Sequence, residues 1–411
     1  MVQTDAEAAG VTDEDLNALR DFMNGRLPAF LADLERLVNI DCGSYSKAGV
    51  DEVGRWVAER LRTLGLDVRT HHNIELGDTV VGTREGPGDG SSLLLIGHMD
   101  TVFEPGTAAE RPFRIEEGRA HGPGVTDMKS GLLAGLYAIE ALRAGQADGH
   151  SPFARLTFVA NPDEEVGSPV STPIIRELAA NADACFVLEC ARANGDIVSS
   201  RKGISEVRLT VHGRSAHAGV EPEKGRNAIV GAARLVTAIH ELNGRWPSVT
   251  ANVGVIRGGT RPNVVPSEAT LEVDIRAAAR PDQEAAEAAL RDLATSSAVP
   301  DTTVDVQLIA RHWPMEKLER SGRLVDYAKA IAGRLGFPLE DAATGGASDA
   351  NTTAGMGIPT LDGLGPIGGL DHSPEEYLEV DSIVPRTTLL AGLLLAVARD
   401  TTIAARRSRE R

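Results

Sequence analysis

The feature that most constrains this chain is a repeated pattern in which a short apolar run ends at side chains that can bind a metal ion. The pattern occurs three times, as residues 93–96 before His98 and Asp100, residues 156–160 before Glu164 and Glu165, and residues 185–188 before Glu189. Runs of this length are typical of strands that are buried on both faces of a parallel sheet. Since ligands gather at the carboxyl ends of the strands in an open α/β sheet, the pattern indicates a metal site at that edge.

These segments also have simpler interpretations. His98 and Asp100 point to the same side of an extended backbone, but Asp100 could equally cap the turn that follows the strand. Residues 163–165 are three consecutive acids, which could form a solvated turn. Adjacent carboxylates at the end of a buried strand are nevertheless costly to hold together without a positive partner, and a cation is the simplest such partner.

Two further candidates stand in loops. Asp127 lies between a Gly-Pro-Gly turn and residues 129–143, whose apolar spacing predicts a helix. His372 follows a glycine-rich loop at residues 363–369, and taken alone it could be a surface histidine.

Imidazoles with carboxylates, and no cysteine, suit zinc, cobalt or manganese. A pair of such ions about 3.5 to 4 Å apart needs a bridging carboxylate and a bridging water, whose pKa falls from about 15.7 towards about 7. A carboxylate that is not a ligand can then act as general base.

Composition limits the other classes of partner. The chain has 411 residues and a formal net charge of -17, with 42 Lys and Arg against 59 Asp and Glu. Because this charge repels phosphate backbones and acidic lipid surfaces, we expect neither nucleic acid nor a membrane as a partner. Residues 389–398 are fewer than the roughly 20 apolar residues that a membrane span needs, and they predict a buried helix.

Cysteine usage and the N-terminal sequence predict a cytoplasmic protein. The three cysteines, Cys42, Cys185 and Cys190, form no CxxC pair and are too few for a disulfide framework. The first residues contain neither a basic segment nor an apolar segment of the kind found in secretion signals.

The order of helical and strand patterns predicts an α/β fold with a mostly parallel sheet flanked by helices. Residues 199–312 read strand, helix, strand, strand, helix, strand, which is the ferredoxin-like order and predicts an inserted α+β lid domain. The catalytic domain would then be discontinuous, comprising residues 1–198 and 313–411. Residues 12–39 have helical spacing, and Pro28 predicts that they form two helices.

Five motifs, taken in order, resemble those of one enzyme family. They are GHMDTV with His98 and Asp100, GPGVTDMKSG with Asp127, NPDEEVGS with Glu164 and Glu165, VLEC with Glu189, and DHSPEE with His372. Together they look like the dinuclear zinc exopeptidases, which include glutamate carboxypeptidases, aminoacylases, succinyl-diaminopimelate desuccinylases and acetylornithine deacetylases. The resemblance covers nearly the whole chain, including the inserted domain.

The resemblance implies a role for each candidate. Asp127 would bridge two divalent ions, most simply zinc, with cobalt or manganese as alternatives. The remaining ligands would be His98 and Glu189 at one ion, and Glu165 and His372 at the other. Asp100 would accept a hydrogen bond from His98, and Glu164 would act as general base.

The resemblance also implies roles in the inserted domain. His217, in SAHAG, would stabilise the tetrahedral oxyanion, often at the site of a partner subunit, so a homodimer through the lid is expected. Arg276 and Asn263 would hold the free carboxylate of the substrate, although Arg276 could instead form a salt bridge on the sheet face. Gly345 and Gly346 would let the backbone approach the substrate closely.

The implied activity is hydrolysis of an amide next to a free carboxylate in a small peptide or an N-acyl amino acid, with release of a C-terminal amino acid. The pattern looks most similar to the glutamate carboxypeptidases, whose preference needs a second cation, for which Arg311 and Lys202 are candidates. Alternatives are an N-acyl amino acid deacylase or dipeptidase with the same machinery, and a non-catalytic metal-binding protein with the same fold.

Overall fold

The computed structural model describes residues 10–86, 90–145, 151–296, 300–400 and 403. The chain divides into two compact units, each with its own hydrophobic core. Unit 1 comprises Met1–Ser199, Lys317–Ala343 and Ser348–Arg411, and unit 2 comprises Ser200–Glu316 and Thr344–Ala347. Gly345 and Gly346 therefore group with unit 2, whereas the sequence-based boundaries assigned them to the catalytic domain.

Unit 1 is built on a six-stranded sheet with the order β1-β2-β6-β3-β7-β14. The strands are β1 (Asp67–His71), β2 (Thr79–Glu85), β6 (Arg155–Asn161), β3 (Ser92–His98), β7 (Ala184–Val187) and β14 (Thr360–Leu361). The last four are parallel to one another, and β2 is antiparallel to both of its neighbours. The predicted α/β class with a mostly parallel sheet is confirmed.

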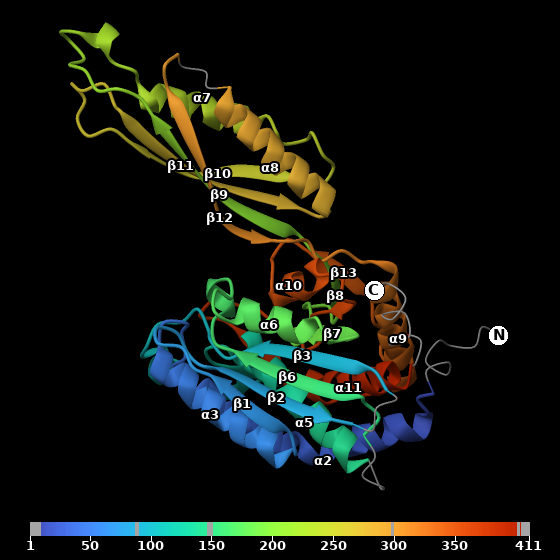
Figure 1. Cartoon of the computed structure of the whole chain (residues 1–411). Coiled ribbons are helices and arrows are strands. Elements are labelled where there is room, and N and C mark those ends of the chain that lie inside the picture. Colours follow the sequence, from blue (N-terminus) through green and yellow to red (C-terminus); the bar gives the residue numbers. More distant parts are fainter. Residues whose placement is uncertain (1–9, 87–89, 146–150, 297–299, 401–402, 404–411) are drawn as a thin grey trace. The chain divides into compact units, whose positions relative to one another are not determined.

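Helices cover both faces of this sheet (Figure 1). On one face lie α3 (Lys47–Thr63), α5 (Ser130–Ala144) and α11 (Ile383–Arg399), and on the other α6 (Ser171–Ala179) and α10 (Asp349–Gly355). Two more helices, α2 (Asp13–Val38) and α9 (Glu319–Leu335), pack against α11.

The helix α2 is continuous, so the prediction of two helices was wrong. Pro28 lies inside it and removes one backbone hydrogen bond. Buried side chains on both sides of the proline pack into the same core, which holds the two halves together: Leu16, Leu19, Met23, Phe30, Leu34 and Leu37.

The prediction of a buried helix at residues 389–398 is confirmed, since every residue in that range of α11 is buried. The apolar segment is longer than predicted. Val380–Arg399 is long and apolar enough to cross a membrane by composition, but 78% of its most apolar window is buried inside the structure, as in a core helix.

A second, four-stranded sheet brings two distant parts of unit 1 together. Its order is β15 (Gly368–Gly369), β16 (Tyr377–Glu379), β5 (Arg119–His121) and β4 (Arg114–Glu116). Because β16 pairs with β5, the β15–β16 connection lies beside the loop that follows β5. These two loops contain His372 and Asp127.

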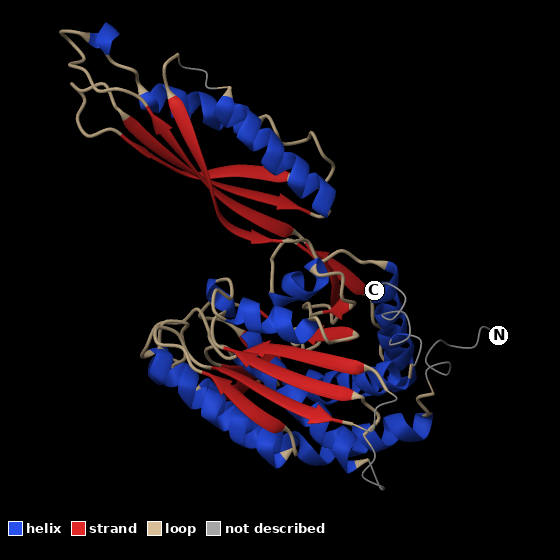
Figure 2. Ribbon diagram, in the orientation of Figure 1, coloured by secondary structure: helices blue, strands red, loops and turns tan. Residues whose placement is uncertain are grey.

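Unit 2 has the predicted ferredoxin-like order, with two helices on one face of a four-stranded antiparallel sheet (Figure 2). Its elements in chain order are β9 (Gly203–His212), α7 (Ala228–His240), β10 (Thr250–Gly258), β11 (Glu268–Ala277), α8 (Arg280–Thr295) and β12 (Thr303–His312). The sheet order is β10-β11-β9-β12. Alternate residues of β9 and β11 are buried, which gives this unit a core separate from that of unit 1.

An ion-pair network in unit 1 ties together segments that are far apart in sequence. Asp341, in β13 (Asp341–Thr344), accepts hydrogen bonds from Lys317 Nζ at 2.7 Å and from the hydroxyl of Ser199, the last residue of β8 (Ile197–Arg201) that belongs to unit 1. Lys329 Nζ lies 3.0 Å from the same carboxylate. Burial acts to raise the pKa of Asp341, but its hydrogen bonds from Lys317, Ser199 and Lys329 lower it from 3.8 to about 2.

Asp341→Asn is expected to lower the free energy of unfolding at pH 7 by about 2 kcal/mol, since each pKa unit corresponds to about 1.36 kcal/mol. A lowered carboxyl pKa stabilises the folded state above the unfolded pKa. The difference between the two proteins should therefore shrink as the pH falls from about 3.8 towards about 2. Urea unfolding of the wild type and of Asp341→Asn between pH 7 and pH 3 measures this difference.

Glu340→Gln is the matched control, because Glu340 is the neighbouring acid, pairs with the same Lys329 and is 74% exposed. The free energy of unfolding of this variant should fall by less than about 0.5 kcal/mol. Equal losses for the two variants, or a loss in Asp341→Asn that does not change with pH, would contradict this assignment.

Candidate metal centre

The candidate ligands of unit 1 follow the parallel strands at one edge of the large sheet. His98 is the last residue of β3, and Glu189 comes two residues after the end of β7. Glu164 and Glu165 begin a short 3-10 turn after β6. Since β3, β6 and β7 are parallel, their carboxyl ends lie side by side, as the sequence pattern predicts.

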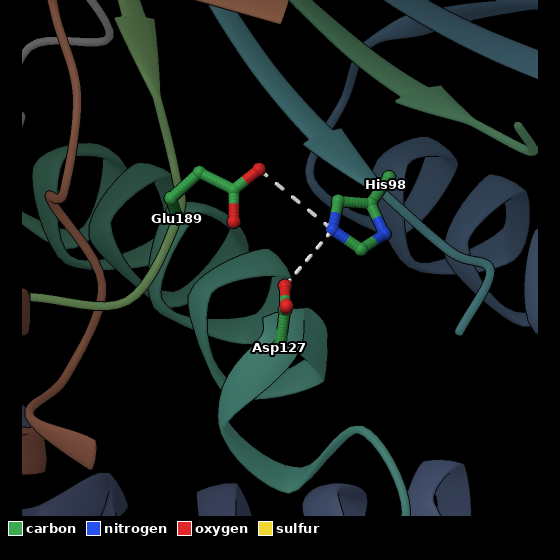
Figure 3. Close-up of side chains that lie close together, drawn as sticks. All are labelled: His98, Asp127 and Glu189. Atoms are coloured by element: carbon green, nitrogen blue, oxygen red, sulfur yellow. Dashed lines mark hydrogen bonds and ion pairs between the residues drawn. The ribbon is translucent and has the colours of Figure 1, made fainter. Parts of the chain in front are cut away.

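The first group of candidate ligand atoms is formed by His98, Asp127 and Glu189 (Figure 3). The Nε2 atom of His98 lies 3.2 Å from Asp127 Oδ1 and 3.7 Å from Glu189 Oε1. Its other ring nitrogen, Nδ1, lies 2.9 Å from the carbonyl oxygen of Asp100. Because a carbonyl oxygen can only accept, Nδ1 carries the proton, and in a neutral ring the lone pair of Nε2 points at two carboxylate oxygens. Such an arrangement of acceptors needs a second proton or a cation between them.

The second group shares Asp127 with the first. His372 Nε2 lies 3.1 Å from Asp127 Oδ2 and 3.1 Å from Glu165 Oε2. Within each group the ligand atoms lie within 4.8 Å of one another. One oxygen of Asp127 therefore faces each group, so one carboxylate joins the two groups.

The pKa shifts at these residues reflect the crowding of opposite and like charges. Burial acts to lower the pKa of His98, but the carboxylates of Asp100 and Asp127 raise it well above its usual value. Hydrogen bonds with Asp127 and Glu165 raise the pKa of His372 to about 11. Burial and the charge of Asp127 raise the pKa of Glu189. Each of these shifts favours the protonated form, so a cation held by these groups would compete with protons.

Two further observations support a divalent ion at these residues. Among the described residues, none donates a hydrogen bond to the buried Oε1 atom of Glu165. His372 has a φ of 62°, a left-handed conformation that side chains other than glycine adopt at a cost. The donors are imidazole nitrogens and carboxylate oxygens, while Cys42, Cys185 and Cys190 are free and buried and belong to neither group. This donor set suits zinc, cobalt or manganese.

Asp100 offers two acceptors to Nδ1 of His98. The carbonyl oxygen of Asp100 is the nearer acceptor for Nδ1, while its carboxylate oxygen Oδ1 lies 3.4 Å away. The carboxylate is fully buried and accepts hydrogen bonds from the Ser44 hydroxyl at 2.7 Å and from the backbone N–H groups of Glu164 and Glu165 at 3.2 Å each. Asp100 thus positions His98 and the acidic turn together.

Glu164 belongs to neither ligand group, although it is adjacent to Glu165. Burial raises the pKa of Glu164 well above its usual value, and the neighbouring Asp349 acts in the same direction. A partly buried carboxyl beside the candidate ligands, with a raised pKa, has the properties of a group that takes up and releases protons.

Glu376 positions Asp127 and was not assigned a role from the sequence. It is 1% exposed, and its carboxylate accepts hydrogen bonds from the N–H groups of Gly124 at 2.9 Å, Thr126 at 2.8 Å and Asp127 at 3.0 Å. Burial raises the pKa of Glu376 to about 7. The only available sequence signal was its place in the DHSPEE motif, four residues after His372.

The predicted residues of the inserted domain lie in unit 2. His217 and Asn263 are exposed and stand in neighbouring loops, where Ala218 N–H donates to Asn263 O at 3.0 Å. The N–H of Gly219 donates to His217 Nδ1 at 3.1 Å, so a neutral His217 carries its proton on Nε2.

Arg276 lies at the other end of the unit 2 sheet. It forms a salt bridge with Asp274 at 3.0 Å, which is the alternative role expected for it, and its Nη1 donates to the carbonyl of Gly345 at 2.8 Å. Gly346 accepts in the same way from Arg201 at 3.1 Å. A Cβ on Gly345 would meet nothing within 4 Å, so the chain itself does not require glycine there.

Of the two candidates for a second substrate-binding cation, Arg311 is engaged elsewhere. Its guanidinium pairs with Glu287, whose side chain is 3% exposed, and it stacks on Trp313 at 4.8 Å. Arg311 therefore neutralises a buried carboxylate, and the other candidate is Lys202.

The fold and the two ligand groups together define a metal-dependent hydrolase of the exopeptidase and amidohydrolase class. Residues 94–396 match the family described as Peptidase family M20/M25/M40, and the chain belongs to this family. The family predicted from the motifs is confirmed.

Individual relatives cover most of the chain. Carboxypeptidase G2 from Pseudomonas sp. (strain RS-16) is 33% identical over 388 residues, which cover 92% of this chain and 92% of that protein. A succinyl-diaminopimelate desuccinylase from Leptothrix cholodnii is 29% identical over 355 residues, with 80% of this chain and 89% of that protein covered. Among solved structures, aminopeptidase PepT from Bacillus cereus has a TM-score of 0.74 at 24% identity, covers 90% of this chain and 99% of that one, and shows the same fold.

Proposed function

We propose that this protein is a dinuclear metal-dependent hydrolase that cleaves an amide next to a free carboxylate and releases a C-terminal amino acid, in the manner of a glutamate carboxypeptidase. The observation that carries the proposal is the sharing of Asp127 between two ligand groups, with Glu164 beside them and outside both. Five ligands with two imidazoles suit a pair of zinc ions, with cobalt or manganese as alternatives.

When bound, the two ions would polarise the scissile carbonyl and lower the pKa of water. Glu164 takes a proton from the attacking water and passes it to the leaving amine, a role that its raised pKa supports. His217 presents an Nε2–H group, which is the tautomer needed to donate a hydrogen bond to a developing oxyanion.

The substrate class rests on the relatives and on the cations of unit 2. The 33% identity to carboxypeptidase G2 supports release of a C-terminal amino acid. The resemblance of the motifs to the glutamate carboxypeptidases favours glutamate, and Lys202 is the candidate for its side-chain carboxylate. The desuccinylase similarity supports the alternative, an N-acyl amino acid deacylase or dipeptidase.

We propose in addition that the protein is a cytoplasmic homodimer, joined through unit 2. Arg276 pairs with Ile204 at one end of the sheet, while the His217 and Asn263 loops adjoin the opposite end, where Glu268 pairs with His212. The eight intervening steps of β11 span roughly 26 Å at about 3.3 Å per residue, so one copy of unit 2 cannot hold a single carboxylate with both Arg276 and Asn263. Two copies supply the two ends separately.

A panel of substrates tests the proposal. The metal-loaded protein should hydrolyse benzoyl-glutamate or N-acyl-glutamates faster than N-acetylated neutral amino acids or plain dipeptides, and Lys202→Met should remove most of that preference. Turnover of neutral N-acyl amino acids alone would favour the deacylase alternative. Failure of every compound in a protein that binds two ions would contradict the proposal and favour a metal-binding protein without activity.

A further inference from the structure

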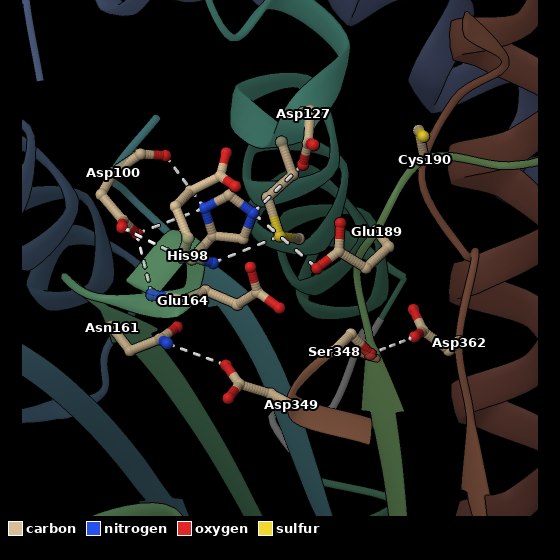
Figure 4. Close-up of polar contacts among 12 residues, drawn as sticks. His98, Asp100, Asp127, Asn161, Glu164, Glu189, Cys190, Ser348, Asp349 and Asp362 are labelled. Atoms are coloured by element: carbon tan, nitrogen blue, oxygen red, sulfur yellow. Dashed lines mark hydrogen bonds and ion pairs between the residues drawn. The ribbon is translucent and has the colours of Figure 1, made fainter. Parts of the chain in front are cut away.

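The acidic turn that carries Glu164 and Glu165 belongs to a loop between β6 and α6, residues 162–170, which we call the base loop. Asn161 precedes it and Ser168 lies near its end. Both contact one distant carboxylate, that of Asp349, the first residue of α10. Asp349 Oδ2 accepts from Asn161 Nδ2 at 2.8 Å (Figure 4). Asp349 Oδ1 accepts from Ser168 Oγ at 2.6 Å.

All three residues of this contact are buried. The exposed fractions are 0% for Asn161, 2% for Ser168 and 3% for Asp349. Buried hydrogen bonds to a charged acceptor are stronger than neutral ones, and their loss leaves polar groups without partners in a medium of low dielectric constant. The two bonds therefore constrain the loop more than equivalent bonds at the surface would.

The base loop has a backbone conformation that needs such a constraint. Ser168 has a φ of 55°, in the left-handed region that side chains other than glycine adopt at a cost. The Asp163 carboxylate closes the end of the loop by accepting from the N–H groups of Val170 at 2.6 Å and Ser171 at 3.2 Å. Asp100 holds the middle through Glu164 N–H and Glu165 N–H. Asp349 joins the two ends, together with a longer bond of 3.3 Å from Asn161 Nδ2 to Ser171 Oγ.

We propose that Asp349 is a positioning residue for the proposed hydrolysis, in which one carboxylate clamps both ends of the base loop and so fixes Glu164 relative to the ligand groups. This proposal rests on the proposed function of Glu164, but the clamp itself can be measured without substrate. Asp349 does not touch the reacting atoms in this scheme. Its positioning effect passes through Asn161 and Ser168, and is separate from the direct effect of its charge on Glu164.

Two variants separate positioning from charge. In Asp349→Asn the side-chain oxygen can still accept from Asn161, and the amide nitrogen can donate to the Ser168 hydroxyl, so both contacts survive without the negative charge. In Asp349→Ala both contacts are lost. Thr353→Val is the matched structural control, because Thr353 is fully buried on the same helix and its hydroxyl contacts Thr360 at 2.9 Å instead of the base loop.

The first measurement is hydrogen exchange of the base loop in the folded, metal-loaded protein. We expect the amides of residues 164–171 to exchange at least about tenfold faster in Asp349→Ala, and at near wild-type rates in Asp349→Asn and Thr353→Val. Unchanged exchange in Asp349→Ala would overturn the proposal, whatever the protein hydrolyses.

The second measurement is steady-state kinetics on the best substrate of the panel. Asp349→Ala should lower kcat by about 100-fold with little change in KM, since small misplacements of a catalytic group have effects of that size. Asp349→Asn should stay within about tenfold of wild type, since it keeps both contacts. If Asp349→Asn loses as much activity as Asp349→Ala, the charge acts instead of the clamp and the proposal is wrong. Absence of turnover in the wild type would count against the proposed function alone, because the hydrogen-exchange measurement of the base loop does not depend on substrate.

Discussion

Replacing Glu164 with glutamine is expected to lower kcat by about 10²- to 10⁴-fold, the usual contribution of a general acid–base group, while the metal content stays at the wild-type level. Glutamine has nearly the same size as glutamate but cannot take up a proton. Because Glu164 belongs to neither ligand group, its loss should leave both groups intact. The measurement is kcat and KM on the substrate panel together with metal analysis of the same samples.

The neighbouring Glu165→Gln variant is the matched control, since it makes the same chemical change one residue away. Glu165 Oε2 lies 3.1 Å from His372 Nε2 and belongs to the second ligand group, so this variant should lose metal as well as activity. Loss of metal in Glu164→Gln, or full activity with the usual metal content, would contradict the assignment of Glu164 as the base.

The ligand strands could be predicted because buried parallel strands have a strong local signature. The apolar runs before His98, Glu164 and Glu189 match β3, β6 and β7, and parallel pairing then requires their carboxyl ends to share one edge. The inserted unit was predictable for a similar reason, since its order of helices and strands is a local property.

Other features of the site depend on contacts between residues that are far apart in sequence, and periodicity carries no information about them. Asp349 is 181 residues from Ser168, and Glu376 is 249 residues from Asp127. Neither acid interrupts an apolar pattern or stands in a recognised ligand spacing. Only the folded chain shows that each carboxylate holds a loop on which a proposed functional side chain lies.

A prediction can also fail where a residue of suitable chemistry is already paired within the fold. Arg311 was a candidate for binding a substrate carboxylate, yet it neutralises the buried Glu287. Pro28 predicted a break in a helix that packing keeps continuous. In both cases tertiary contacts outweigh the local preference.

Asp127→Asn is expected to lower activity about as much as Glu164→Gln does, but through the loss of a metal ion. The side-chain amide offers one oxygen, so it can replace the carboxylate towards either His98 or His372 but not towards both. Metal analysis should find at most about one tightly bound ion per chain, and the affinity of the second should fall by at least about 100-fold, a loss at the upper end of what changes around ligands produce. Activity should fall with the second ion.

Asp371→Asn is the control for this variant, because it makes the same change beside the proposed ligand His372, at an exposed position outside both groups. The pKa of His372 in the metal-free proteins gives an independent test of its contact with Asp127. The contacts with Asp127 and Glu165 raise the pKa of His372 to about 11, so removal of the Asp127 charge should lower that pKa, while Glu165 keeps it above the usual 6.5. An NMR titration of His372 in the metal-free proteins measures the shift. If the pKa falls but two ions still bind tightly, Asp127 is a neighbour of the metal site and not its bridge, and the argument that joins the two ligand groups into one dinuclear centre fails.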